Sequence, residues 1–325
     1  MKNLSNYFKL KKYLIFIEKY PRVQNLAKIN NKFLKQILFK FYLYFIKKNK
    51  NLNYFFFEKP REIKNIWFDV NDIFNENYKL FESLSQNGII IVQNVVDEEE
   101  LKKIKNYFNE ITSKNIVSEW LTPEIVDAAS IKYKNEKKNV EISYMRKDVK
   151  YLPTLEKLSQ ILTKKIFGDI VNTSAEFFVH NCKFNEEKNN IYEDTNFHID
   201  RYLPCLKIIY SPNAIQSTDA PFGFIKKTHK LNNEFMKNFI INTKNFIIKN
   251  DEINKELTEN IVKAECPPNS LIITFTNGFH KRNIFLKNDT IRKTVFFQYT
   301  SNFNTMSLLN FKKYNSLSKI EKKIN

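Results

Sequence analysis

The chain has 325 residues, of which 42% are hydrophobic, 15% aromatic and 27% charged. This composition is typical of a folded protein with a sizeable core, and only four glycines and nine prolines exclude collagen-like and low-complexity architectures. The formal net charge is +18, and residues 1–60 contribute +12 of it through 14 basic and 2 acidic residues. We interpret residues 1–60 as a basic, aromatic extension and residues 61–325 as the main domain. An AT-rich coding sequence is an alternative explanation of the basicity.

The extension carries apolar residues at helical spacing over residues 33–45, which predicts a helix. This helix either packs on the main domain, which we favour because Phe and Tyr crowd its circumference, or contacts an anionic membrane surface peripherally. No stretch approaches the ~20 apolar residues of a membrane span. The three cysteines form no CxxC pattern, which argues against a disulfide framework or a Cys-rich zinc site. We therefore expect a cytoplasmic protein.

Two helices and a strand are predicted in the first half of the main domain. The apolar run Gly88–Val95 indicates a buried strand. Asp97, with Glu100 three residues later, is typical of a helix N-cap with a capping box. A second helix is predicted over Pro153–Phe167 and ends at Gly168.

The second half of the chain is rich in short β-type runs separated by turn residues. The predicted strands are 175–184, 191–202, 206–210, 223–227, 271–276, 279–285 and 291–300. A polar, helix-compatible insertion at about 231–263 interrupts them. Many short strands at this spacing favour a sandwich or a jelly-roll barrel. The fold class is therefore mainly β with flanking helices (α+β), with a jelly-roll core that follows N-terminal helices.

Only four histidines are available for metal or acid–base chemistry. His198 and Asp200 lie two residues apart on a predicted strand, so they share one face. One more histidine would complete a 2-His-1-carboxylate set, which holds non-haem Fe(II) and leaves coordination positions open. His280 is favoured because a strand and a turn precede it, and His229 is the alternative. His180 is interpreted as a core residue.

Arg292 follows His280 by twelve residues and shares one face of its predicted strand with Thr294. A guanidinium binds a carboxylate with two parallel hydrogen bonds, and a hydroxyl two residues on adds another. This pair suits the distal carboxylate of 2-oxoglutarate. A surface charge on a half-exposed strand is the alternative interpretation of Arg292.

Four stretches in this order carry a family resemblance: FHIDRY, LKIIY, PFGFIKKTHK, and NSLIITFTNGFHKRN leading to IRKT. Together they resemble the phytanoyl-CoA dioxygenase-like branch of the Fe(II)/2-oxoglutarate oxygenases, over about residues 80–300. The resemblance implies a double-stranded β-helix of the cupin-like kind. It also implies a dioxygenase that uses Fe(II), 2-oxoglutarate and O2, hydroxylates a small organic substrate, and releases succinate and CO2.

The resemblance implies roles for individual residues. His198, Asp200 and His280 would hold the iron, and Arg292 and Thr294 would hold the cosubstrate. Further candidates lie nearby: Lys207 for cosubstrate binding, and Arg201, Tyr202 and Arg282 for substrate binding. Solvated charges on a strand or at the pocket rim are the alternative for Lys207 and the two arginines. The alternative function is a membrane-surface or nucleic-acid-binding protein that uses the barrel as a scaffold, and nucleic acid is the less favoured of these two partners.

Overall fold

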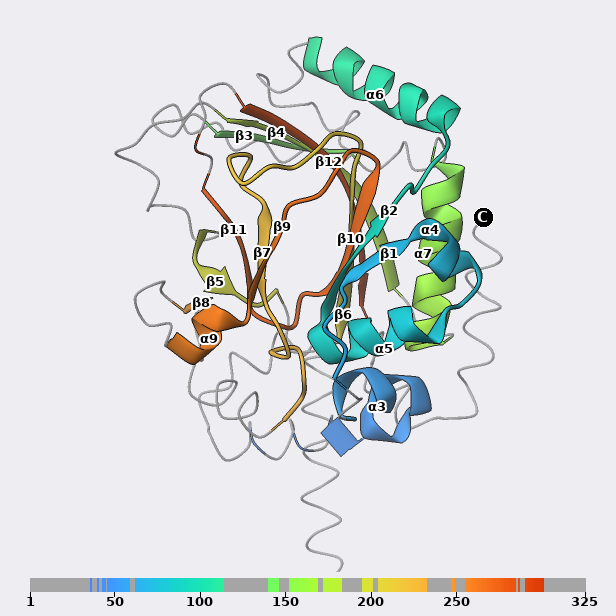
Figure 1. Cartoon of the computed structure of the whole chain (residues 1–325), viewed down its shortest axis with the longest axis vertical. Coiled ribbons are helices and arrows are strands. Elements are labelled where there is room, and N and C mark those ends of the chain that lie inside the picture. The colour runs from blue at the N-terminus through green and yellow to red at the C-terminus, as the bar shows by residue number, and fades with distance from the viewer. Residues whose placement is uncertain are drawn as a thin grey trace, which may run out of the picture.

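A computed structural model of the chain contains two β-sheets and a set of helices (Figure 1). It describes residues 46–58, 62–113, 140–145, 152–168, 172–182, 195–200, 204–232, 247–248, 255–284 and 290–300, together with residues 36, 40, 43, 44 and 286. The predicted α+β class is therefore confirmed within these residues.

The larger sheet has seven strands, in the order β1 (Trp67–Asp69), β2 (Ile89–Gln93), β10 (Ser270–Phe275), β6 (Cys205–Ser211), β12 (Thr290–Thr300), β4 (Asn172–Cys182) and β3 (Val140–Met145). The smaller sheet has five, in the order β8 (Ile247–Ile248), β5 (Phe197–His198), β11 (His280–Arg282), β7 (Phe222–Ile225) and β9 (Ile261–Ala264). All neighbours pair antiparallel except β1 and β2. The described helices with printed bounds are α3 (Lys50–Phe56), α4 (Val70–Phe74), α5 (Tyr78–Asn87), α6 (Glu98–Ser113), α7 (Pro153–Phe167) and α9 (Lys255–Glu259).

The central strands β2, β10 and β6 of the seven-stranded sheet are buried on both faces. On β6, Ile208 and Tyr210 belong to a hydrophobic cluster that also contains side chains of α3, α5 and α7. Ile209, between them, belongs to a second cluster with Phe224 of the five-stranded sheet. Because successive strand residues point to opposite faces, one face of the large sheet packs on helices and the other faces the small sheet. The space between the sheets is therefore lined by every second residue of β2, β10 and β6.

The strand predicted at Gly88–Val95 is confirmed as β2, and its unbroken apolar run reflects burial on both sides. Gly88 ends α5 with a φ of 78°, in the left-handed region. A Cβ atom at this position would also collide with the ring of His229. Glycine is required here for both reasons.

The predicted helix boundaries at α6 and α7 are also confirmed. Asp97 Oδ1 accepts a hydrogen bond of 2.8 Å from Glu100 N, as an N-cap does. The Glu100 carboxylate accepts from Thr154 N, at 3.3 Å, in the first turn of α7. Helix α7 ends before Gly168, whose φ is 64°.

The described end of the N-terminal extension packs into the main core. Ile46, Leu52, Phe55 and Phe56 are all buried there with side chains of α5, α7 and the large sheet. Asn49 caps α3 by accepting from Leu52 N at 3.1 Å. Residues 1–35 and most of the predicted 33–45 helix lie outside the described residues. Among the described residues, no helix is long and apolar enough to cross a membrane.

Two predicted elements differ from the structure. The strand expected at 191–202 is described only as the two residues of β5, so Asp200 lies beyond its end. The insertion expected to be helical at 231–263 contains the strands β8 and β9 in addition to α9. Residues 261–264 alternate in burial and pair with β7, so the small sheet recruits the end of the insertion.

The turn between β7 and residue 231 ties the helices to the sheets. His229 is buried, with Nε2 2.8 Å from Ser85 O and its ring stacked on Phe275 at 5.3 Å. Asn277 Nδ2 donates to His229 O at 2.7 Å, just before the turn that leads to β11. Lys230 Nζ donates to Phe55 O at 2.9 Å, near the end of α3. The pKa of Lys230 is lowered to about 7 by burial.

We predict that the His229→Gln variant loses less stability in acid than the wild type. Burial, together with the charge of Lys230, holds the pKa of His229 well below its usual 6.5. An unfolded chain takes up this proton as pH falls through 6.5 whereas the folded chain does not, so acid favours unfolding by about 1.4 kcal/mol per pH unit for this group. Urea unfolding of the metal-free wild type and variant between about pH 7.5 and 5.5 measures how the free energy of unfolding of each protein changes with pH. Equal slopes would contradict the assignment.

Candidate metal centre

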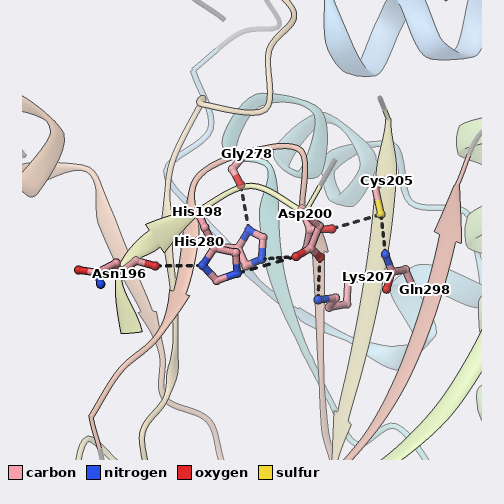
Figure 2. Close-up of polar contacts among 9 residues, drawn as sticks. Asn196, His198, Asp200, Cys205, Lys207, Gly278, His280 and Gln298 are labelled. Carbon is pink, nitrogen blue, oxygen red and sulfur yellow. Dashed lines mark hydrogen bonds and ion pairs between the residues drawn. The ribbon is translucent and has the colours of Figure 1, made fainter. Parts of the chain in front are cut away.

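Three of the predicted site residues lie together between the sheets. His198, Asp200 and His280 each offer a ligand atom, and these atoms all lie within 4.8 Å of one another (Figure 2). The two histidines are direct cross-strand partners on β5 and β11. Their ring centroids are 4.4 Å apart. His280 is 2% exposed, and the other two side chains are about one fifth exposed.

Both imidazoles are oriented through their Nδ1 atoms. His198 Nδ1 lies 2.9 Å from Asn196 O, and His280 Nδ1 lies 2.9 Å from Gly278 O (Figure 2). A carbonyl can only accept, so each Nδ1 carries the proton and each Nε2 presents a lone pair. Metal-binding histidines are oriented by contacts of this type.

The lone pairs converge on one carboxylate oxygen. Asp200 Oδ1 lies 3.3 Å from Nε2 of His280 and 3.8 Å from Nε2 of His198. In the described part of the chain, Nε2 of His280 is a buried atom with no hydrogen-bond donor. Acceptors that face one another in a buried place are unfavourable unless a cation lies between them. The geometry therefore fits a metal ion.

The protonation states of His198 and Asp200 also favour metal binding. Burial lowers the pKa of His198 to about 4, helped by the nearby His280, so its imidazole is neutral at physiological pH. Burial alone would raise the pKa of Asp200, but the positive charge of Lys207 is the largest opposing influence, and the pKa lies well below its usual range. A neutral imidazole, as at His198, and an ionised carboxylate are forms that bind metals.

Asp200 is positioned by the strands of the large sheet. Asp200 N donates to Thr276 O at 2.9 Å, and Thr276 N donates to Cys205 O at 2.9 Å. Cys205 Sγ accepts from Thr276 Oγ1 at 3.2 Å. It also accepts from Gln298 Nε2 at 3.3 Å (Figure 2). The chain thus crosses from the small sheet to the large sheet at the residue that supplies the carboxylate.

His280 is held by the turn before it and by an aromatic ring. The Phe222 ring stacks on the imidazole at 5.3 Å with an interplanar angle of 22°. Phe279 N donates to Thr228 Oγ1 at 2.9 Å. A Cβ atom on Gly278 would come within 2.7 Å of Phe224 Cζ, so this turn requires glycine for close approach.

The predicted cosubstrate residues also face the space between the sheets. Arg292 and Thr294 are 8% and 1% exposed, while Val295 between Thr294 and Phe296 packs in the helix-facing cluster. Arg292 Nη1 donates to Ala220 O, two residues before β7. The expected alternation on β12 is confirmed, and a surface position for Arg292 is wrong because its side chain lies between two sheets.

The remaining candidates differ in position. Lys207 points toward Asp200, with Nζ 2.8 Å from Oδ2. Arg282 lies two residues after His280 on β11 and is 8% exposed, so the interpretation as a solvated rim charge is wrong. Arg201 and Tyr202 lie outside the described residues, as does the side chain of His180.

Sequence reasoning missed several residues of this site. Asn196 and Gly278 act through backbone oxygens, which no side-chain pattern can indicate. Thr276 was assigned only to a predicted strand, Cys205 was considered only as one of three cysteines, and Phe222 appeared only within the motif PFGFIKKTHK. A single signal was available in the apolar strand β6, where Lys207 is the only charged residue.

Comparisons with known proteins gave matches only among solved structures. No protein-family model matches the chain, and no curated protein sequence matches it.

Three of the structural matches are of similar extent. The non-heme alpha ketoglutarate dependent epimerase SnoN from nogalamycin biosynthesis is 13% identical to this chain, with a TM-score of 0.46. The match covers 67% of this chain and 78% of the SnoN chain. EctD from S. alaskensis, solved with 2-oxoglutarate and 5-hydroxyectoine, is 13% identical with a TM-score of 0.45, covering 70% and 77%. AviO1 from Streptomyces viridochromogenes Tue57 is 12% identical with a TM-score of 0.45, covering 69% and 94%.

We predict that Asp200→Asn weakens binding of a divalent ion by at least about 100-fold. The amide keeps the shape of the side chain but removes the charge on which both Nε2 atoms converge. Titration with cobalt(II), followed by its visible absorption, measures the affinity. Glu265→Gln, the same change at an exposed position, should match the wild type. Equal affinities for both variants would exclude Asp200 as a ligand.

Proposed function

We propose that the chain is an Fe(II)- and 2-oxoglutarate-dependent dioxygenase that oxidises a small organic substrate. The observation that carries this proposal is the convergence of two imidazole Nε2 atoms and one carboxylate oxygen in a partly buried place between the sheets. Two imidazoles and one carboxylate are the donors of the facial set that binds non-haem Fe(II) and leaves other positions open. His198, Asp200 and His280 would hold the ion.

The cosubstrate would extend from the metal toward Arg292. This guanidinium is buried in the same space and lies on the same face of β12 as Thr294, so the two can donate to one distal carboxylate. When bound, iron and 2-oxoglutarate supply an oxidant derived from O2, with succinate and CO2 as coproducts. The protein contributes binding, orientation and exclusion of water.

Apolar rings of the chain would keep water from the reacting centre. Phe222 stacks on His280, and Phe296 lies on the inner face of β12 between Thr294 and Gln298. Arg282 is proposed to bind the substrate from the neighbouring inner position of β11, and Arg201 and Tyr202 from the segment after Asp200. A substrate with an anionic group would suit these side chains.

The fold supports the same proposal. Strands β7 and β9 of the small sheet pack against β2, β6, β10 and β12 of the large sheet, and we assign this arrangement to a double-stranded β-helix within residues 61–325. Within that class we favour the phytanoyl-CoA dioxygenase-like branch, on the order of the motifs from His198 to Arg292. We place the enzyme in the cytoplasm, since Cys205 and Cys266 are buried free thiols.

The direct test is anaerobic addition of Fe(II) followed by 2-oxoglutarate. Chelation of the bound ion by a 2-oxo acid should produce a weak visible charge-transfer band, and His198→Ala should lose it. Admission of O2 should then release succinate, measured by NMR. A wild-type protein that binds Fe(II) but develops no band would exclude 2-oxoglutarate as the cosubstrate.

Arg292→Met should weaken anaerobic binding of 2-oxoglutarate by about 100-fold, because two charge-assisted hydrogen bonds are lost. Arg292→Lys should be intermediate, since an ammonium cannot form the paired contact. Cobalt(II) affinity is the control, and both variants should keep it. A parallel loss of cobalt(II) binding would show that Arg292 supports the fold and not the cosubstrate.

A further inference from the structure

Lys207 occupies an unusual place for a lysine. It is the only charged residue of β6, the middle strand of the seven-stranded sheet, and its side chain is 17% exposed. Its inner-face neighbours in register are Thr274 on β10 and Gln298 on β12. A lysine here loses most of its hydration, so a specific interaction must compensate for it.

The ammonium finds that interaction at the metal centre. Lys207 Nζ lies 2.8 Å from Asp200 Oδ2 (Figure 2). It also lies 5.9 Å from the centre of the Phe296 ring. His198 and His280 belong to the small sheet, whereas Lys207 belongs to the large one. The ion pair therefore joins the two sheets at the carboxylate.

The two oxygens of Asp200 consequently have different surroundings. Oδ1 faces Nε2 of His280 at 3.3 Å and Nε2 of His198 at 3.8 Å, while Oδ2 faces the ammonium of Lys207. A carboxylate held in this way offers one oxygen to a metal and keeps the other engaged. Without the ammonium, the carboxylate could rotate away or bind the ion with both oxygens.

We propose that Lys207 is a positioning residue that holds Asp200 as a one-oxygen metal ligand. The role rests on the metal centre of the proposed function, and it replaces direct cosubstrate binding as the task of this lysine. A one-oxygen carboxylate leaves more of the coordination sphere to a chelating cosubstrate and to O2. Lys207 acts through Asp200 and does not itself touch the ion.

The test is a cobalt(II) titration, which requires no turnover. Lys207→Met keeps the apolar stem and removes the ammonium, so its cobalt(II) affinity should fall by about 10- to 100-fold and its visible spectrum should change as the carboxylate ligation changes. Lys207→Arg restores a donor to Oδ2 and should recover both the spectrum and most of the affinity. Thermal unfolding without metal shows that each variant is folded.

Lys293→Met is the matched control. Lys293 lies on β12 in the same sheet but donates to Asn109 Oδ1 at 2.6 Å, away from the ligands, so this variant should behave as the wild type.

Wild-type affinity and spectrum in Lys207→Met, or tighter binding, would overturn the proposal. If Lys207→Met does not fold, Lys207→Gln, which keeps a neutral donor, should retain the wild-type spectrum, and an altered spectrum would overturn it. A wild type that binds no cobalt(II) would instead contradict the metal centre itself.

Discussion

The partly buried carboxylate of Asp200 lies among groups whose positions are explained together by one metal site. Two imidazole nitrogens approach one of its oxygens, and an ammonium approaches the other. An ionised carboxylate is costly to bury, and here its neighbours keep it charged while leaving one oxygen directed at two lone pairs. The strands that supply these groups come from both sheets. The site therefore forms only when the two sheets pack against each other.

The scaffold around this centre is held by contacts that extend to the first helices. The turn at 226–231 places His229 against Ser85 and Phe275, and its backbone accepts from Asn277 in the turn that leads to His280. Gly88 and Gly278 leave room for this ring and this backbone. The helical layer thereby supports the strand that carries a ligand, although no helix contributes a ligand in the described part of the chain.

The proposed chemistry follows from the direction of the donors more than from their identity. Histidines and aspartates often lie close together, but here both Nδ1 atoms are occupied by carbonyls and both Nε2 atoms are directed inward. Arg292 and Thr294 provide cationic and hydroxyl donors in the same space, and the ammonium of Lys207 lies at the Asp200 oxygen that does not face the two histidines. A metal chelated by an anionic 2-oxo acid suits this distribution of charge.

Much of the site was predictable because it depends on local pattern. Alternation on β12 placed Arg292 and Thr294 on one face, scarcity of histidine limited the ligands, and helix caps at Asp97 and Gly168 were visible as residue types. The end of β5 at His198, the strands within the insertion, and the ion pair of Lys207 were not visible. Which residues can share a face of a strand follows from the local chain, because side chains alternate with a period of two. That His198 meets His280 and Lys207 meets Asp200 is a property of the folded protein, because pairing between distant strands depends on how the two sheets close.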